Sequence, residues 1–237
     1  KIQKSNTREI DKAITLLDDC KNYGTLPFAH LARAAFISIA ILKSAVETNV
    51  ISQEAFDSFL SSINTVSHEF TKDLKALEDS SNKKDWELFF EKYGHLRPGT
   101  YDITSLSYSE AREKYLSKDI TYNEKRYLYD LSKWNKEKVY LFDILRNNGF
   151  QFSNEYFERF FYLSIEGREL SKFIFTKNIS KSLDYFIYFG ETLGLDRKKL
   201  SHLPLSIFQE YQKGLINSLK VKEIFSKLSS EGEEQRK

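Results

Sequence analysis

The sequence predicts an all-α fold, an irregular bundle of about eight to ten helices with one long loop that contains glycine and proline. Apolar residues recur at helical spacing along most of the 237-residue chain, and no segment alternates convincingly between apolar and polar residues. The chain has only nine glycines and three prolines, and two of the glycines and one proline fall within residues 93–108. Aromatic residues make up 15 % of the chain, which is enough to fill a core.

The first two helices are expected on either side of Gly24. Apolar residues keep helical spacing over 10–17, and the second helix begins near Thr25 with Pro27 in its first turn. This second helix, through residue 46, is apolar nearly all round. We therefore expect it to be the buried hub of the fold.

Shorter helices follow in the middle of the chain. Ser52 is placed to cap one of them, and a break near Asn64 leads to a helix that runs through Leu77. Residues 85–93 form another short helix, and residues 107–120 are weakly helical in pattern.

Four longer helices are expected in the C-terminal half, over 122–148, 153–175, 180–194 and 206–228. The polar tail at 229–237 is expected to be frayed. No linker is long enough to mark a boundary, so we expect a single helical domain over 1–237.

Bulk properties restrict the function. Lysine and arginine number 36 against 34 acidic residues, which gives no argument for binding nucleic acid or a membrane. The longest apolar run falls short of the roughly 18 residues of a membrane span. The single cysteine, Cys20, is expected to be a buried structural thiol in a reducing, cytoplasmic compartment. The four histidines lack the spacing of metal ligands, and no phosphate-binding glycine loop is present.

The loop at 93–108 holds four side chains suited to binding or proton transfer, His95, Arg97, Tyr101 and Asp102. His95 is the candidate proton donor or acceptor, Arg97 would bind an anion, and Asp102 would accept a proton or orient Arg97. The alternative is structural. In that case Arg97 and Asp102 form an ion pair that closes the loop, with Tyr101 packed over it.

Two further groups of cationic residues lie on predicted helices. His30 and Arg33 sit in the apolar second helix, where Arg33 has no acidic neighbour three or four positions away. A charge in such a helix either pairs internally, with Asp102 or Glu169, or faces a polar cleft where it binds a ligand.

Arg168 and Lys172 lie four residues apart on one helix face, and Lys177 follows at a predicted helix break before Ser180. Two neighbouring cations suit an anion such as phosphate or carboxylate, which the amides of the next helix could also bind. A solvated face and an ordinary turn between two helices are the alternatives.

Three segments resemble the central region of the phosphoenolpyruvate synthase family of phosphotransferases. In chain order they are Tyr-Gly-Thr-Leu-Pro-Phe-Ala-His-Leu-Ala-Arg from residue 23, Tyr-Gly-His-Leu-Arg-Pro-Gly-Thr-Tyr-Asp from residue 93, and Arg-Glu-Leu-Ser-Lys-Phe-Ile-Phe-Thr-Lys-Asn-Ile-Ser from residue 168. They occur in order, and the resemblance spans roughly residues 10–205.

The resemblance implies that the chain is the middle of a longer cytoplasmic kinase-like enzyme, between an ATP-grasp domain and a swivelling histidine domain. These domains of the same polypeptide are its expected partners. ATP and magnesium are implied for the full-length enzyme, and no cofactor is implied for this fragment. Ser201 and His202 lack the preceding glycines of the family's phosphate-carrying histidine. We therefore expect His202 to have a local role at a helix end, and the chain to contain no complete active site.

Three functions are consistent with the sequence. The chain is an acceptor-binding or linker domain of such a phosphotransferase, in which His30, Arg33, Arg97, Tyr101, Arg168, Lys172 and Lys177 bind an anionic substrate. Alternatively it is a structural scaffold on which the mobile phosphohistidine domain docks. The third possibility is an independent helical interaction module. Internal ion pairs of the cationic residues would favour the scaffold.

Overall fold

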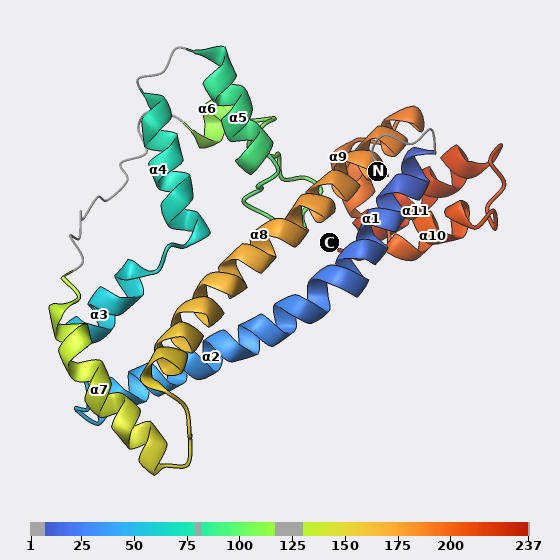
Figure 1. Ribbon diagram of the computed structural model, residues 1–237. Coiled ribbons are helices and arrows are strands. Elements are labelled where there is room, and N and C mark those ends of the chain that lie inside the picture. The colour runs from blue at the N-terminus through green and yellow to red at the C-terminus, as the bar shows by residue number, and fades with distance from the viewer. Residues whose placement is uncertain (1–7, 79–81, 117–129, 237) are drawn as a thin grey trace. The chain divides into compact units, whose positions relative to one another are not determined.

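The computed structural model describes residues 8–78, 82–116 and 130–236 of the chain. It confirms the all-α prediction, because the described residues form helices and no strand (Figure 1). The helices are α1 (Glu9–Asp19), the π-helical turn η2 (Cys20–Thr25), α2 (Leu26–Glu47), α3 (Gln53–Ser62), α4 (Val66–Glu78), α5 (Lys83–Tyr93), α6 (Arg112–Tyr115), α7 (Ser132–Asn147), α8 (Asn154–Thr192), α9 (Arg197–Ser201), α10 (Leu205–Gln212) and α11 (Val221–Gln235).

The chain divides into two compact units where the sequence predicts a single domain. Unit 1 comprises Lys1–Gly24, Ser81–Lys118 and Ile174–Lys237, and unit 2 comprises Thr25–Ser80 and Asp119–Phe173. The long helix α8 contributes residues to both units.

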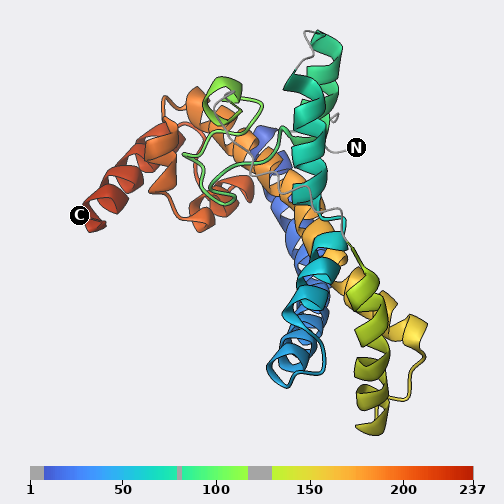
Figure 2. The same cartoon turned by 90° about the vertical axis from the view of Figure 1, so that its left-hand side faces the viewer.

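The core of unit 1 is formed by α1, the C-terminal part of α8, and α9 to α11. Phe186, Phe208 and Phe225 meet there edge to face, with ring centroids 4.7 and 5.2 Å apart. In Figures 1 and 2 the C-terminal helices gather beside α1, and α1 packs against α10. The turn between α8 and α9 follows from Gly194, whose positive φ of 73° suits glycine, and from Asp196, which caps α9.

The core of unit 2 is formed by α2, α3, α7 and the N-terminal part of α8. Trp134 of α7 is fully buried and stacks on Phe59 of α3 at a centroid distance of 4.2 Å. The Ser52 cap is confirmed, because its hydroxyl accepts a hydrogen bond from the Ala55 amide. Glu137 of α7 accepts hydrogen bonds from the amide and the hydroxyl of Ser52, which ties α7 to the start of α3.

Helix α2 is not the buried hub that its composition predicts. Only Ala35, Ser38, Leu42 and Ala45 are buried, in one stripe at helical spacing. Phe36 and Ile37 are 61 % and 53 % exposed. Three of these four buried residues are small, and on this side α8 approaches closely, because the Ser38 and Ser164 hydroxyls are 2.7 Å apart.

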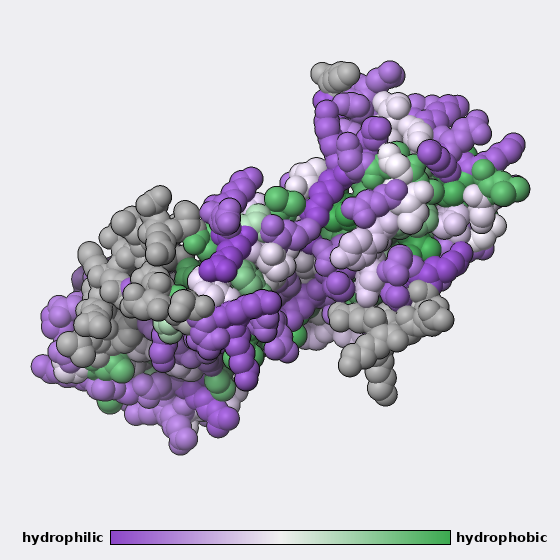
Figure 3. All heavy atoms as spheres, turned by 90° about the horizontal axis from the view of Figure 1, so that it is seen from above, coloured by the Kyte–Doolittle hydropathy of each residue, from purple (hydrophilic) through white to green (hydrophobic). Residues whose placement is uncertain are grey.

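One stretch, Glu9–Glu47, is long and apolar enough to cross a membrane by length and composition, and 22 % of its most apolar window is buried. Core helices of soluble proteins pass the same test, and so do N-terminal signal sequences. The face of the molecule in Figure 3 is mostly hydrophilic, with apolar side chains in separate patches.

The predicted helix break near residues 176–180 is wrong, because α8 runs without interruption from Asn154 to Thr192. Tertiary packing overrides the polar local sequence there. Ile179 is buried, and the buried Ser182 donates a hydrogen bond from its hydroxyl to the Ala13 carbonyl of α1. The helix predicted over 206–228 is instead two helices, with Gly214 at a φ of 76° in the turn that separates them.

Two further segments, one near Gly24 and the other at residues 229–235, also differ from the prediction. The chain does not leave helical structure at Gly24, since η2 leads directly into α2. The tail is not frayed over residues 229–235, which belong to α11. There the buried Ser229 donates to the Lys199 carbonyl of α9. The predicted start of the 122–148 helix lies outside the described residues.

Candidate functional site

The candidate site is the loop that follows α5, which folds back on itself within unit 1. Gly94 ends α5, and the Ser109 amide donates a hydrogen bond to the Gly94 carbonyl at 3.2 Å. One step further in, the Tyr108 amide donates to the Leu96 carbonyl at 2.9 Å. A methyl group added at Gly94 would lie 2.4 Å from the Phe90 carbonyl oxygen, so this tight turn requires glycine.

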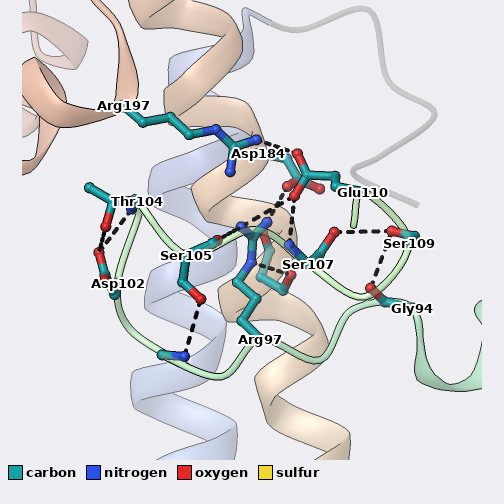
Figure 4. A network of polar contacts seen from close by, with 12 residues as sticks. Gly94, Arg97, Asp102, Thr104, Ser105, Ser107, Ser109, Glu110, Asp184 and Arg197 are labelled. Carbon is teal, nitrogen blue, oxygen red and sulfur yellow. Dashed lines mark hydrogen bonds and ion pairs between the residues drawn. The ribbon is translucent and has the colours of Figure 1, made fainter. Parts of the chain in front are cut away.

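Arg97 is the centre of this loop (Figure 4). Its side chain is only 1 % exposed, and its guanidinium contacts both the loop and helix α8. Nε donates to the Ser180 hydroxyl at 3.0 Å, and one terminal nitrogen contacts Asp184 Oδ1 at 2.5 Å. The other terminal nitrogen donates to the Ser105 carbonyl at 2.6 Å and lies 3.5 Å from Glu110 Oε2.

Glu110 extends the network to a third element, because its carboxylate also pairs with Arg197 of α9. It accepts a hydrogen bond from the Ser107 amide at 2.8 Å. Partial burial disfavours the charged carboxylate, but the Ser107 amide and the Arg197 guanidinium outweigh burial and hold the pKa of Glu110 below its ordinary value.

The structural alternative for this loop named the wrong partners, because Arg97 does not pair with Asp102 and Tyr101 does not pack over such a pair. Asp102 Oδ1 instead accepts hydrogen bonds from the Thr104 amide and hydroxyl, at 2.8 and 2.7 Å, and so shapes the tip of the loop. Tyr101 is 66 % exposed. His95 is partly buried, and both of its ring nitrogens are shielded from solvent.

The cationic residues on α2 and on the first part of α8 belong to unit 2. His30, Arg33 and Lys172 are exposed, and within the described residues the cations of Arg33 and Lys172 have no ion-pair partner. Glu169, the partner suggested for Arg33 that lies in the same unit, pairs with Arg168 instead. Arg168 lies 3.7 Å from Glu169, and its guanidinium stands over the Phe36 ring at 5.3 Å.

The structure therefore places the predicted residues in two groups. The first group is His95, Arg97, Tyr101 and Asp102, which share one loop in unit 1. Unit 1 also contains the exposed Lys177, which lies on α8 and not in the loop. The second group, on α2 and the first part of α8, lies in unit 2. Because α8 is continuous at Lys177, no helix N-terminus is present there to offer amides to an anion. His202 is the C-cap residue of α9, in agreement with the helix-end role expected for it.

Sequence reasoning missed the side chains that partner Arg97 and extend its network, namely Ser180, Asp184, Glu110 and Arg197. Ser180 and Asp184 are four residues apart on one helix, so both present their side chains to the same neighbour. This spacing was available in the sequence. The pairing of that helix face with a residue more than 80 positions earlier was not, since it depends on how the loop folds.

Comparisons with models of known protein families, with curated proteins and with solved structures find no match to this chain. The family resemblance consequently rests on the three segments themselves. Two of them contact each other in unit 1, because Arg97 of the second segment hydrogen-bonds Ser180 at the end of the third.

The arrangement is suited to holding the loop in place. All described polar contacts of the Arg97 guanidinium are with the protein's own hydroxyl, carbonyl and carboxylate oxygens. A buried guanidinium satisfied in this way has little capacity left for a substrate anion. Within the described residues no group of three or more histidine, cysteine or acidic side chains has the arrangement of a metal site.

Proposed function

We propose that this chain is the central helical scaffold of a phosphoenolpyruvate synthase-like phosphotransferase and that it does not transfer phosphate by itself. The observation that carries the proposal is the burial of Arg97 in contacts with Ser180 and Asp184. The arginine in the most informative of the three segments is committed to joining that loop to α8. Its neutralising carboxylates favour the structural alternative over an anion site.

In this proposal the chain supplies the rigid part of a larger enzyme. The mobile phosphohistidine domain and the ATP-grasp domain would be its partners, and ATP with magnesium would bind outside this chain. The network joins the loop, α8 and α9, so a partner that docks on the loop would meet a surface fixed at three points.

An acceptor-binding domain is the second candidate, and one observation favours it. Arg33 and Lys172 in unit 2 are exposed cations without an ion-pair partner among the described residues, so they are available to an anionic acceptor. Such a site would lie in unit 2 and would not use the loop.

The test combines a turnover assay with a thermal-shift screen. The purified chain is incubated with radiolabelled ATP and magnesium, and its melting temperature is measured with phosphate, pyruvate, phosphoenolpyruvate and ATP. The scaffold proposal predicts no ATP turnover, no shift with any ligand, and a large drop in melting temperature for Arg97→Ala.

Three other outcomes would change the conclusion. A concentration-dependent shift that survives Arg97→Gln but disappears in Arg33→Ala and Lys172→Ala would favour the acceptor-binding domain. A shift that requires Arg97 would contradict its structural role. ATP turnover by the purified chain would contradict both candidates.

A further inference from the structure

A groove between α2 and α8 in unit 2 has no part in the network described above. It encloses a volume of about 280 Å³, close to the lower end of the usual range for small-molecule sites. Its walls are mainly apolar, with Leu31 and Ala34 from α2 facing Phe160 and Leu163 from α8.

The groove exists because the two helices approach closely on one side of it. The hydroxyls of Ser38 and Ser164 are 2.7 Å apart, and a methyl group added at Gly167 would lie 3.2 Å from Leu31 Cδ2. Large side chains stand up beside this contact. Tyr156 and Leu163 are 53 % and 45 % exposed and form the rim.

The polar group at the floor of the groove, the Ser164 hydroxyl, needs no hydrogen bond from a ligand. The hydroxyl of the buried Ser164 donates to the Phe161 carbonyl at 3.2 Å and is paired with the Ser38 hydroxyl. Its hydrogen-bonding capacity is therefore met within the protein, and an apolar group can lie over it at no cost in lost hydrogen bonds.

Among the described residues that line the groove, Arg159 alone carries a charged side chain. Arg159 is exposed, and no described residue forms an ion pair with its guanidinium. Arg159 also lines a neighbouring cavity, together with Glu155 and Glu158. Glu155 lies four residues earlier on α8 and does not line the groove. The Glu158 carboxylate already has partners in the protein. Its Oε1 accepts hydrogen bonds from Lys138 Nζ at 2.7 Å and from the Trp134 indole nitrogen at 3.2 Å.

We propose that this groove binds a monocarboxylate with an apolar tail, such as a medium-chain fatty acid. The tail lies between Leu31, Phe160 and Leu163, and the carboxylate pairs with the fork of the Arg159 guanidinium. A small polar anion such as phosphate would leave the apolar walls unused, and a neutral chain would leave the guanidinium unpaired. This inference does not depend on the proposed function.

The test is titration calorimetry of the purified chain with decanoate, kept below its micellar concentration, and with decanol and butyrate as probes of the two halves of the ligand. Wild-type protein should bind decanoate saturably at one site and butyrate far more weakly. Arg159→Gln should weaken decanoate binding about tenfold and leave decanol binding unchanged. Ala34→Phe, which fills the groove, should abolish both.

The control is Lys43→Gln, because Lys43 is an exposed cation on α2 that does not line the groove. It should bind decanoate as the wild type does. The proposal is overturned if decanoate does not saturate, or if Arg159→Gln weakens binding no more than Lys43→Gln. Self-association of the chain that Leu163→Asp abolishes would also overturn it, since the groove would then be an interface between copies. Circular dichroism checks that each variant is folded.

Discussion

At the scale of single residues, Arg97 shows how burial decides between two roles for one side chain. An exposed arginine gains little from an ion pair and remains available to ligands. A buried one must be neutralised and hydrogen-bonded, and here Ser180, Asp184, Ser105 and Glu110 meet that requirement. The same guanidinium that would bind a substrate anion in an open cleft therefore becomes a structural link.

Removing this guanidinium should be strongly destabilising. Arg97→Ala is expected to lower the free energy of unfolding by about 3 kcal/mol, because it leaves the Asp184 carboxylate without its main partner. Arg97→Lys should recover part of the loss, since it restores the charge but not the planar fork. Equilibrium unfolding in urea, followed by circular dichroism, measures both. Arg33→Ala, at an exposed and unpaired position, should change stability by at most about 0.5 kcal/mol, and a similar loss in both alanine variants would refute the assignment.

Glu110 should make stability depend on pH on the acid side. Its pKa in the folded protein lies below the ordinary value of 4.5, so its contribution is present above that value and is lost as the pH falls through the folded pKa. The melting temperatures of wild type and Glu110→Gln, measured from neutral pH downwards, should therefore differ most near neutrality and converge in acid. A gap that widened below the ordinary pKa would contradict this assignment.

Cys20 should be unreactive in the folded protein. Burial, and to a lesser degree the neighbouring Asp19 carboxylate, raise the pKa of the Cys20 thiol to about 11, and its sulfur donates to the Phe175 carbonyl at 3.5 Å. Because the thiolate is the reactive form, labelling by a disulfide reagent at neutral pH should be slow and should accelerate on unfolding. Equal labelling rates in the folded and the denatured chain would disprove the buried role.

At the scale of elements, the sequence predicted best where local signals are complete. Ser52 caps α3 as expected, and Pro27 lies in the first turn of α2. It failed where contacts between distant residues decide. The polar stretch near Lys177 has the composition of a turn, yet it remains helical. On either side of it, the Phe175 carbonyl and the Ser182 hydroxyl hydrogen-bond Cys20 and Ala13 of unit 1. Helix α2 was predicted to be buried all round, but its Phe36 and Ile37 are exposed. Composition alone does not reveal whether a neighbouring helix covers an apolar face.

Close packing of α8 on α9 should make Gly190 intolerant of alanine. A methyl group there would lie 2.5 Å from Leu200 Cδ1, and Leu200 is buried. Gly190→Ala should destabilise the protein by about 1–3 kcal/mol, although alanine is the better helix former. In a Leu200→Ala background the same change should become neutral or stabilising, because the space is then free. Additive losses in urea unfolding of the four proteins would contradict the packing argument.

At the scale of the whole molecule, the fold class was predictable and the organisation of the candidate site was not. Helical periodicity is a local property, so the all-α fold follows from it. The predicted site joined cationic residues that the structure places in two compact units, with Arg33 and Lys172 in one and Arg97 in the other. Residue types identify which side chains can bind an anion, but only the folded chain decides whether carboxylates have already neutralised them.

The central claim, that Arg97 holds the loop to α8 and binds no substrate, is tested most directly by hydrogen–deuterium exchange. The amides of residues 94–110 are compared in wild type, Arg97→Ala and Arg33→Ala, with and without phosphoenolpyruvate. Exchange in the loop should rise many-fold in Arg97→Ala alone, and the ligand should protect no loop amide in any of the three proteins. Unchanged exchange in Arg97→Ala, together with ligand protection of the loop that this substitution removes, would show instead that Arg97 is an anion-binding residue.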